Sequence, residues 1–479
     1  MTTKPDETSA DSAGRGATRM LAAHAATLAY DAIPAQVISL TKQYLLDTLG
    51  VAIGASSLAP EAKIIDEYVR DFGGRAESTV LGFGGKAPAA WAAFVNGSLG
   101  HMLDYDDVGD HCHYGIATVP VAFAIAEKRG GASGRDLLAA IVAGTDVHAR
   151  LAQSIDIPDW TMSEGWFATQ LLGGLSGAAV AARLMGLDGE AIENAFGIAY
   201  TQMGGSRQMA VNVATHLRSM QAGFSGQAAI LSAELTARGI VGSKEVIEGR
   251  YGLFRNYVRT STPRWSVILD GLGSRFPVVD THCFKVWPAC AVTRPTNAAM
   301  LELRRKHSLR PEDIASITVV SNEGDKTHLL SVPVELKRRP RTSIDAKYSV
   351  PFTLAAMMVH GDVRLRHYTP EALDDPAVLD MADRIDFRAA SAADGGAKVK
   401  MTPIVEVKTR DGRALAHQVP GVPGDPNNPV SQALLEEKFR DCVSFAVNPV
   451  SKRNVEKVIE LVADLENVPD ATDVMRLLA

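Results

Sequence analysis

The sequence predicts a mainly α-helical protein with an added α+β part, in which a large all-helical domain is built from both termini and a smaller α+β domain is inserted. Helical spacing of apolar residues runs through the first half of the chain. Alternating apolar residues appear only after about residue 260, and two amphipathic segments close the chain. We therefore place the helical domain at residues 20–275 and 428–479, and the α+β domain at residues 276–427.

The first half predicts a series of helices. Apolar residues recur at three-to-four spacing from about Thr18 to Arg75, and Pro88–Leu103 begins with a proline suited to a first helical turn. The pattern continues at Val119–Arg129, Leu137–Leu151, Leu171–Met185, Asp188–Met203 and Gly226–Gly239. Several of these segments are rich in Ala and Gly, which let helices approach closely, so they should be central and buried. We expect no strand before about residue 260.

The second half mixes both periodicities. Ile314–Ser321 alternates like a half-buried strand, and residues 404–410 and 413–419 flank Asp411-Gly412, a strong hairpin signal. Helices are expected at Arg294–His307, Ala346–His360 and Thr369–Asp383. The closing helices are expected at Asn428–Phe445 and Ser451–Asn467, with Lys438 and Lys457 on their polar faces.

Composition limits the function classes. The chain has 479 residues, of which 46% are hydrophobic and 22% charged. Its formal net charge of -6 argues against nucleic acid as the main partner and against a basic surface that would bind a membrane. The four cysteines form no CxxC pair, which argues against a zinc or iron–sulfur site and suits a reducing compartment. Met1–Arg19 lacks the apolar segment of a secretory signal, and no run of 18 apolar residues follows. The sequence therefore predicts a cytoplasmic protein with a disordered leader at residues 1–19.

One stretch, Gly100–Gly115, concentrates ionisable groups between two apolar runs. It holds four aspartates and three histidines, namely Asp104, Asp106, Asp107, Asp110, His101, His111 and His113. Such groups are costly to bury unless they are paired or used in chemistry, so this stretch is the candidate active site, with a solvated loop as the alternative. His111 and His113 could ligate a divalent ion with the carboxylates. No second ligand pair stands at a diagnostic spacing elsewhere, so no metal site is predicted.

An ordered set of motifs resembles the MmgE/PrpD family, which includes 2-methylcitrate dehydratase and cis-aconitate decarboxylase. The set covers most of the chain from about residue 20. It consists of Asn96–Asp107, His113 seven residues before Pro120, Gly174–Leu187, Phe284–Cys290, Ala346–Phe352 and Gly424–Val430.

The resemblance implies a helical domain with an α+β lid domain, usually in a homodimer, and chemistry on small di- or tricarboxylates that needs no cofactor. Asp104 stands at the position of the family's active-site aspartate. His113 stands at that of its acid/base histidine, and Lys285 at that of the lysine in the lid-side motif.

Several positions depart from the family pattern. Val108 stands where a threonine is found in decarboxylase-like members, Phe167 where most members have a second histidine, and Arg218 where a lysine is usual. Phe352 replaces a tyrosine and Arg294 a histidine. Arginine cannot donate a proton at neutral pH, so a step that needs an acid at position 218 is lost.

We assign roles from the chemistry of the groups. His113 can act as base or acid because imidazole titrates near neutral pH, Asp104 could orient it, and Lys285 and Arg218 could hold substrate carboxylates. His111, Asp107, Phe167, Val108 and Arg294 complete the predicted substrate-binding set, and His111 or His216 could compensate for the lost groups.

The predicted activity is that of a lyase, a dehydratase or decarboxylase, that moves a proton at the carbon next to a carboxylate. An isomerase or epimerase of a dicarboxylate, similar to iminodisuccinate epimerase, is the first alternative, because such a reaction needs fewer acid and base groups. A catalytically weakened protein that binds carboxylates is the second.

Overall fold

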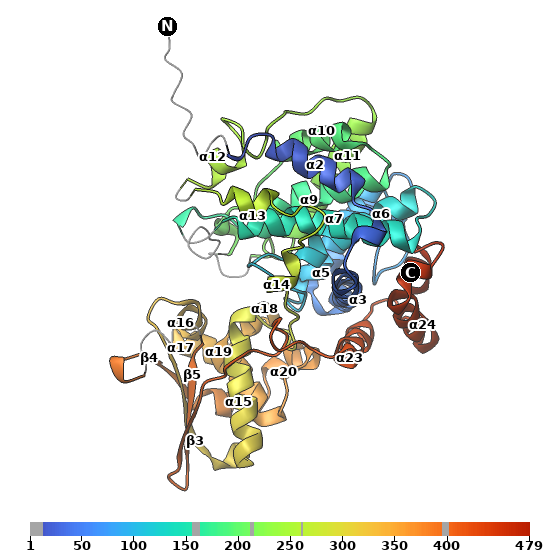
Figure 1. The fold of residues 1–479 in the computed structure, drawn as a ribbon. Coiled ribbons are helices and arrows are strands. Elements are labelled where there is room, and N and C mark those ends of the chain that lie inside the picture. Colours follow the sequence, from blue (N-terminus) through green and yellow to red (C-terminus); the bar gives the residue numbers. More distant parts are fainter. Residues whose placement is uncertain (1–12, 156–162, 211–214, 260–261, 395–401) are drawn as a thin grey trace. The chain divides into compact units, whose positions relative to one another are not determined.

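The structure is a computed structural model that describes residues 13–155, 163–210, 215–259, 262–394 and 402–479 (Figure 1). The chain divides into two compact units. Unit 1 comprises Met1–Met102, Asp106–His282 and Ser431–Ala479, and unit 2 comprises Leu103–Tyr105 and Cys283–Val430. The sequence placed the inserted domain at residues 276–427. The helical fold with a small α+β part confirms the predicted fold class.

Unit 1 is built almost entirely from helices. Its α-helices are α2 (Ala17–Thr27), α3 (Ala35–Leu58), α4 (Pro60–Phe72), α5 (Ala89–Met102), α6 (Tyr114–Lys128), α7 (Gly134–Gln153), α9 (Ala168–Leu184), α10 (Gly189–Tyr200), α11 (Gln221–Ala237), α12 (Leu253–Tyr257), α13 (Trp265–Leu269), α14 (Val278–Thr281), α23 (Gln432–Val443), α24 (Lys452–Ala463) and α25 (Asp473–Leu478). Short 3₁₀ helices lie at Tyr30–Ala32, Arg207–Ala210 and Leu465–Asn467. Residues 1–12 of the predicted leader lie outside the described residues, and α2 begins at Ala17, inside that predicted leader.

Helix α9 is the centre of unit 1. It packs against α6, α7, α10 and α11, as the Ala- and Gly-rich sequence predicted. A Cβ at Gly177 would lie 2.7 Å from the Ala229 Cβ, and one at Gly144 would lie 2.4 Å from the Val180 side chain. These helices therefore approach closely because their contact residues carry almost no side chain.

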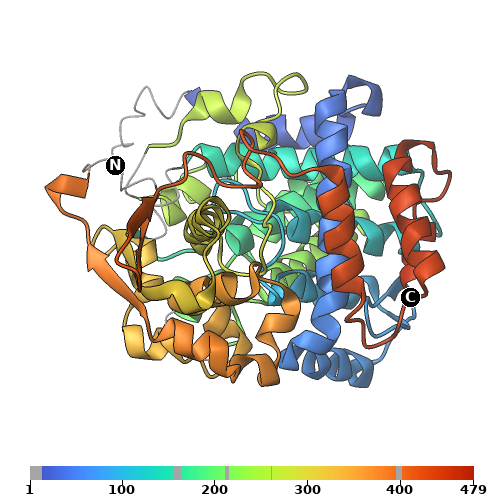
Figure 2. The ribbon, with the colours of Figure 1, turned by 90° about the horizontal axis from the view of Figure 1, so that it is seen from below.

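The two ends of the chain meet within unit 1. Figure 2 shows α23, from the C-terminal segment, beside α3 from the N-terminal segment, and the two helices pack along their length. The Nζ atom of Lys438 on α23 lies 2.5 Å from Asp47 Oδ1 on α3, and both side chains are buried. Burial raises the pKa of Asp47 to about 6. The prediction that Lys438 lies on a polar face was wrong, because this lysine pairs with a buried carboxylate.

The expectation of no strand before residue 260 was also wrong. β1 (Ser78–Thr79) pairs antiparallel with β2 (Lys86–Ala87). Strands of two residues are too short to show an alternation in the sequence.

Unit 2 is an α+β unit around one mixed sheet. Strands β3 (Ile314–Ser321), β4 (Ile385–Ala389), β5 (Ile404–Thr409) and β6 (Ala414–His417) lie in the order β4-β3-β5-β6. β3 pairs parallel with β4 and antiparallel with β5, and β5 and β6 form the predicted hairpin about Asp411-Gly412. The helices are α15 (Arg294–His307), α16 (Lys326–Ser331), α17 (Val334–Arg338), α18 (Ser343–Lys347), α19 (Val350–His360), α20 (Pro370–Leu373) and α21 (Pro376–Ala382), with 3₁₀ helices at Ala291–Thr293, Pro311–Asp313, Leu365–Tyr368 and Ala392–Asp394.

The helices of unit 2 follow the predicted positions with two breaks. The helix predicted at Ala346–His360 is divided between α18 and α19, because Ser349 is the N-cap of α19. α15 packs on β5 and β6 and on α19, and these elements enclose the apolar core of the unit. The helix predicted at Thr369–Asp383 is split into α20 and α21. The split falls at Pro376, which begins α21 behind the N-cap Asp375, because a proline cannot continue a preceding helix.

Across the described residues, no helix combines the length and the apolar character that crossing a bilayer requires.

Candidate active site

The predicted acidic stretch leads into helix α6 of unit 1, and a tight turn lies just before that helix. Gly109 and Cys112 exchange both backbone hydrogen bonds, at 2.8 and 2.7 Å, and the two residues between them, Asp110 and His111, have φ of 50° and 58°. This is the backbone of a two-residue hairpin turn, which aspartate tolerates well. His111 is exposed at the tip of this turn. The turn delivers the chain to His113, the N-cap of α6.

A single buried carboxylate lies between two histidines. Asp106 Oδ2 lies 2.7 Å from Nδ1 of His113, and Asp106 Oδ1 lies 2.9 Å from Nδ1 of His101. Asp106 is completely buried, and the two imidazole rings are 4.3 Å apart between centroids. We call His101, Asp106 and His113 the histidine–aspartate cluster.

The surroundings of His113 fix the tautomer of its neutral ring. Nδ1 of His113 also lies 2.8 Å from the carbonyl oxygen of Asp107. Both of these neighbours can only accept hydrogen bonds, so Nδ1 must be the donor. In the neutral ring, Nε2 is then the basic nitrogen, which is the form that a general base needs.

Asp107 holds the start of α6. Its carboxylate accepts backbone N–H groups from Tyr114 at 3.2 Å and Gly115 at 3.1 Å, and it lies 3.0 Å from Nε2 of His282. Carboxylates at a helix N-terminus are stabilised by the free N–H groups there. Asp107 therefore fixes the backbone that directly follows His113, and its predicted role in substrate binding stays a prediction.

The first turn of α9 lies against His113. Thr169 Oγ1 accepts the backbone N–H of His113 at 3.1 Å, and Phe167 is the N-cap of the same helix. The guanidinium of Arg218 lies over the Phe167 ring, 5.5 Å from its centroid. Two positions where the family pattern departs, 167 and 218, are thus in contact with each other. Val108, a third, is half-buried in the loop before the turn.

Unit 2 contains the remaining predicted catalytic groups. Nζ of Lys285 donates to the carbonyl oxygen of Asp104 at 2.9 Å and to its carboxylate at 2.5 Å, and Lys285 is only 1% exposed. Asp104 itself has φ of 48°, a strained conformation for a residue with a side chain. Burial and the neighbouring Asp104 carboxylate raise the pKa of Tyr368.

The motifs of unit 2 meet at the segment that precedes Lys285. The backbone N–H of Phe284 donates to Gly424 O at 3.0 Å, and a Cβ at Gly424 would lie 1.9 Å from the Phe284 carbonyl oxygen, so only glycine fits. Arg294 pairs with Asp425 at 2.7 Å. Phe352 is buried, with its ring 6.2 Å from that of Tyr368. The structure therefore gathers the Phe284–Cys290 and Gly424–Val430 motifs, although the role of Arg294 stays a prediction.

The histidine–aspartate cluster also has the composition of a metal site. One ligand atom from each of His101, Asp106 and His113 lies within 4.8 Å of the others. The sequence had weighed His111 with His113 for this role, whereas the structure brings His101 to His113. The prediction of no metal stays a prediction.

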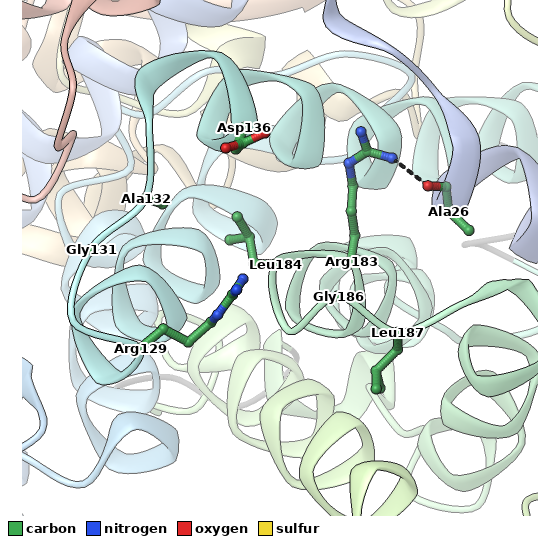
Figure 3. Close-up of a pocket in the computed structure, with 9 residues that line it drawn as sticks. All are labelled: Ala26, Arg129, Gly131, Ala132, Asp136, Arg183, Leu184, Gly186 and Leu187. Carbon is green, nitrogen blue, oxygen red and sulfur yellow. Dashed lines mark hydrogen bonds between the residues drawn. The ribbon is translucent and has the colours of Figure 1, made fainter.

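A separate hollow of about 400 Å³ in unit 1 is lined by other residues (Figure 3). Arg183 from α9 projects into it and donates to the carbonyl oxygens of Ala25 at 2.6 Å and Ala26 at 3.0 Å at the end of α2. An arginine placed on the last carbonyls of a helix stabilises that helix. None of the predicted site residues lines this hollow.

Sequence reasoning missed three residues that complete these groups. It chose Asp104 to orient His113, but the carboxylate on the His113 ring is that of Asp106. His101 lies near the end of α5, 5 residues before Asp106, and His282 lies far along the chain. Asp106 and His101 were visible as members of the acidic stretch, whereas nothing in the local sequence marks His282.

The fold and these groups define a two-unit, mainly helical protein with a buried imidazole–carboxylate cluster suited to moving protons. The chain belongs to the MmgE/PrpD family, as the sequence motifs predicted. Residues 19–266 match the MmgE/PrpD N-terminal domain, and residues 287–465 match the MmgE/PrpD C-terminal domain.

Curated relatives match over nearly the whole chain. A cis-aconitate decarboxylase-like protein, oryM, from Aspergillus oryzae is 26% identical over 93% of this chain and 94% of its own. The cis-aconitate decarboxylase of Aspergillus terreus is 26% identical over 98% and 97%. The human cis-aconitate decarboxylase is 26% identical over 92% and 90%.

Proposed function

We propose that this protein is a lyase that acts on a small tricarboxylate or dicarboxylate by proton transfer at the carbon next to a carboxylate, without a cofactor. The observation that carries the proposal is the orientation of His113. Its Nδ1 faces the Asp106 carboxylate and the Asp107 carbonyl, which leaves Nε2 as the base. The curated relatives, which are named as cis-aconitate decarboxylases, support a lyase rather than another class of enzyme.

In the proposed mechanism His113 moves the proton and Asp106 stabilises its charged form. In a decarboxylation, the bond to the carboxyl carbon breaks, carbon dioxide leaves, and the electron pair stays on the substrate carbon, which then takes a proton from the His113 imidazolium. In a dehydration, Nε2 of His113 takes the proton from the carbon and the electron pair forms a carbon–carbon double bond. The C–O bond breaks, and the hydroxyl group takes a second proton, supplied from solvent, and leaves as water. Asp106 stabilises the imidazolium in either case, because a buried negative charge lies 2.7 Å from the ring.

Cationic side chains would bind the carboxylates of the substrate. In unit 1 we propose Arg218 for this role, because a guanidinium can hold a carboxylate through two hydrogen bonds and the Phe167 ring beneath it limits its motion. In unit 2 we propose that Lys285, held by Asp104, acts as a fixed positive charge or a proton donor. His111, at an exposed turn, keeps its predicted binding role as a proposal.

The contact between Arg218 and Phe167 favours an isomerase as the second candidate. Dehydration needs an acid as well as a base, and an arginine over a phenylalanine supplies neither. A one-base isomerisation or epimerisation of a dicarboxylate needs only His113. A catalytically weakened protein that binds carboxylates would keep Arg218 and lose turnover.

Proton NMR in D2O separates these candidates. The panel comprises citrate-like hydroxy acids, cis-aconitate, itaconate and amino- or imino-linked succinates, with His113→Ala as the matched control. A vinyl signal that appears or disappears supports the lyase and identifies its substrate. Deuterium that enters at an α-carbon without a change of skeleton supports the isomerase. Line broadening of one ligand without turnover supports the catalytically weakened protein that binds carboxylates, and it overturns the proposed activity.

A chelator tests the metal-independent part of the proposal. Activity should survive treatment with EDTA and dialysis, and elemental analysis of the purified protein should find less than one metal ion per chain. Loss of activity that returns with one divalent ion would assign the histidine–aspartate cluster to a metal instead. The cytoplasmic location and the homodimer stay predictions.

A further inference from the structure

Tyr368 of unit 2 is a buried tyrosine whose hydroxyl group lacks a hydrogen bond. It is the last residue of the 3₁₀ helix Leu365–Tyr368, and it is only 4% exposed. Across the residues that the structure describes, no group forms a hydrogen bond with its Oη atom. Buried tyrosines normally find a partner for this group, because a buried hydroxyl has lost its hydrogen bonds to water. A ligand that carries an acceptor atom would supply that partner.

Charged side chains surround the Tyr368 ring. The ammonium group of Lys347, the last residue of α18, lies over the ring at 5.7 Å from its centroid, and Lys347 is 3% exposed. Asp104 acts electrostatically on Tyr368 and accepts a hydrogen bond from Nζ of Lys285. We call Asp104, Lys285, Lys347 and Tyr368 the Tyr368 cluster, and all four residues belong to unit 2. Two ammonium groups and one carboxylate give this cluster an excess of one positive charge.

The Tyr368 hydroxyl acts as a donor. Burial and the neighbouring Asp104 carboxylate raise its pKa well above the usual value, so the hydroxyl keeps its proton at neutral pH. A carboxylate oxygen is a strong acceptor for such a donor, because hydrogen bonds to ionised groups are roughly twice as strong as those between neutral groups. A neutral carbonyl could also accept this proton, but only an anion also matches the positive charge of the cluster.

The backbone of unit 2 holds the Tyr368 cluster in place. The backbone N–H of Cys290 donates to the carbonyl oxygen of Lys347 at 3.0 Å, which ties α18 to the segment that contains Lys285. The buried ring of Phe352 packs beside Tyr368, with 6.2 Å between the ring centroids. The hydroxyl of Tyr368 is therefore fixed before any ligand arrives, which is what a binding group requires.

We propose that the Tyr368 cluster is a carboxylate-binding subsite, in which the Tyr368 hydroxyl donates a hydrogen bond to one carboxylate of the ligand. The ammonium groups of Lys285 and Lys347 attract the same carboxylate. The subsite rests on the proposed function in one respect, because its ligand is the small di- or tricarboxylate proposed above. It adds Tyr368 and Lys347 to the residues that recognise this ligand.

Replacing Tyr368 by Phe separates this role from a structural one. The change removes the hydroxyl and keeps the ring that packs on Phe352 and lies under Lys347. Because the hydroxyl is unpaired in the free protein, the melting temperature of unliganded Tyr368→Phe should equal or exceed that of the wild type. A purely structural hydroxyl would instead be paired in the free protein, and its removal would lower the melting temperature.

Isothermal titration calorimetry with citrate, cis-aconitate and itaconate measures the binding. The His113→Ala background prevents turnover during the titration. In this background, Tyr368→Phe should raise the dissociation constant of the bound probe by about tenfold to a hundredfold, as expected for a lost hydrogen bond to a charged group. Lys347→Met should also weaken binding, and Lys347→Arg should retain most of the affinity because it keeps the positive charge.

Tyr200→Phe in unit 1 is the matched control. The Tyr200 hydroxyl donates to the carbonyl oxygen of Tyr251 at 2.6 Å and accepts from Nδ2 of Asn256 at 2.7 Å. Its removal should therefore lower the melting temperature and leave the dissociation constant unchanged, the reverse of the pattern expected for Tyr368→Phe.

Two results would overturn the subsite alone. One is a Tyr368→Phe variant that binds the probe as tightly as its parent, and the other is a Tyr368→Phe variant that melts clearly below the wild type. A parent protein that binds none of the three probes would overturn the proposed function together with the subsite. The failure of one is thus distinguished from the failure of the other.

Discussion

Replacing Asp106 by Asn keeps the size of the side chain and removes the charge between the two histidines. The Asp106 carboxylate accepts a hydrogen bond from Nδ1 of His101 at 2.9 Å, and its other oxygen lies 2.7 Å from Nδ1 of His113. An amide has only one acceptor oxygen, so its NH2 group must face one of the two rings. That ring then has to present a lone pair at Nδ1 and carry its proton on Nε2.

The expected loss follows from this geometry. Where the NH2 group faces His113, the base nitrogen is protonated and cannot accept the substrate proton. Where it faces His101, His113 keeps its tautomer but loses the negative charge that stabilises the imidazolium. Hydrogen bonds to charged groups contribute roughly 1.5–3 kcal/mol each, and removing the orienting carboxylate of a comparable site costs up to about 10⁴ in rate. We expect kcat to fall by about 10²–10⁴, equivalent to roughly 2.7–5.4 kcal/mol of transition-state stabilisation.

The assay is turnover of the panel substrate that the wild type consumes, followed by NMR. Asp110→Asn is the matched control, because Asp110 belongs to the same loop but bonds to Tyr114 and Thr281. A folded Asp106→Asn variant with kcat within about threefold of wild type would refute the argument that Asp106 sets the state of His113.

Four further predictions concern single residues. His113→Ala should abolish turnover and leave the fold intact by circular dichroism, and an unchanged rate would remove His113 from the site. Phe167→His should change substrate preference across the panel, and an unaltered profile counts against a role for this position. Lys285→Met leaves the Asp104 carboxylate buried without its ammonium partner, so the free energy of unfolding should fall by about 3–5 kcal/mol. Adding Asp104→Asn should recover part of this loss. Equal stability of the wild type and the Lys285→Met variant would contradict the prediction. Burial lowers the pKa of His148 from 6.5 to about 3. The unfolded ring therefore takes up a proton below about pH 6.5 while the folded ring does not, so acidification favours the unfolded chain. His148→Leu should reduce the loss of unfolding free energy between pH 7.5 and 5.5 by about 1.4 kcal/mol, measured by urea unfolding, and an unchanged loss would contradict it.

Periodic segments were predicted well because their signal is local. Arg294–His307 coincides with α15, and Ile314–Ser321 coincides with β3. Val119–Arg129 was predicted to be a helix, but α6 begins earlier, at Tyr114. The extra turn is held by the Asp107 carboxylate, and no periodicity of apolar residues records such a contact.

Pairings between distant residues were the part that the sequence could not supply. The acidic stretch identified the right segment, yet the choice of Asp104 over Asp106 as the partner of His113 depended on how the backbone turns. Asp104 has a left-handed backbone and pairs with Lys285, 181 residues away. Likewise, the local sequence around Lys438 predicts a solvated lysine, because its buried partner Asp47 lies on the distant helix α3.

The packing of α23 on α3 has a consequence for how the protein is made. Translation adds about 5–20 residues per second, so α3 leaves the ribosome long before α23 exists. Until Ser431–Ala479 has been synthesised, the face of α3 that α23 covers is open and Asp47 lacks its lysine. Every strand of unit 2, by contrast, is complete before α23 begins. The apolar surface of α3 that α23 later covers is therefore exposed in the nascent unit 1. We expect molecular chaperones to bind this surface at that stage.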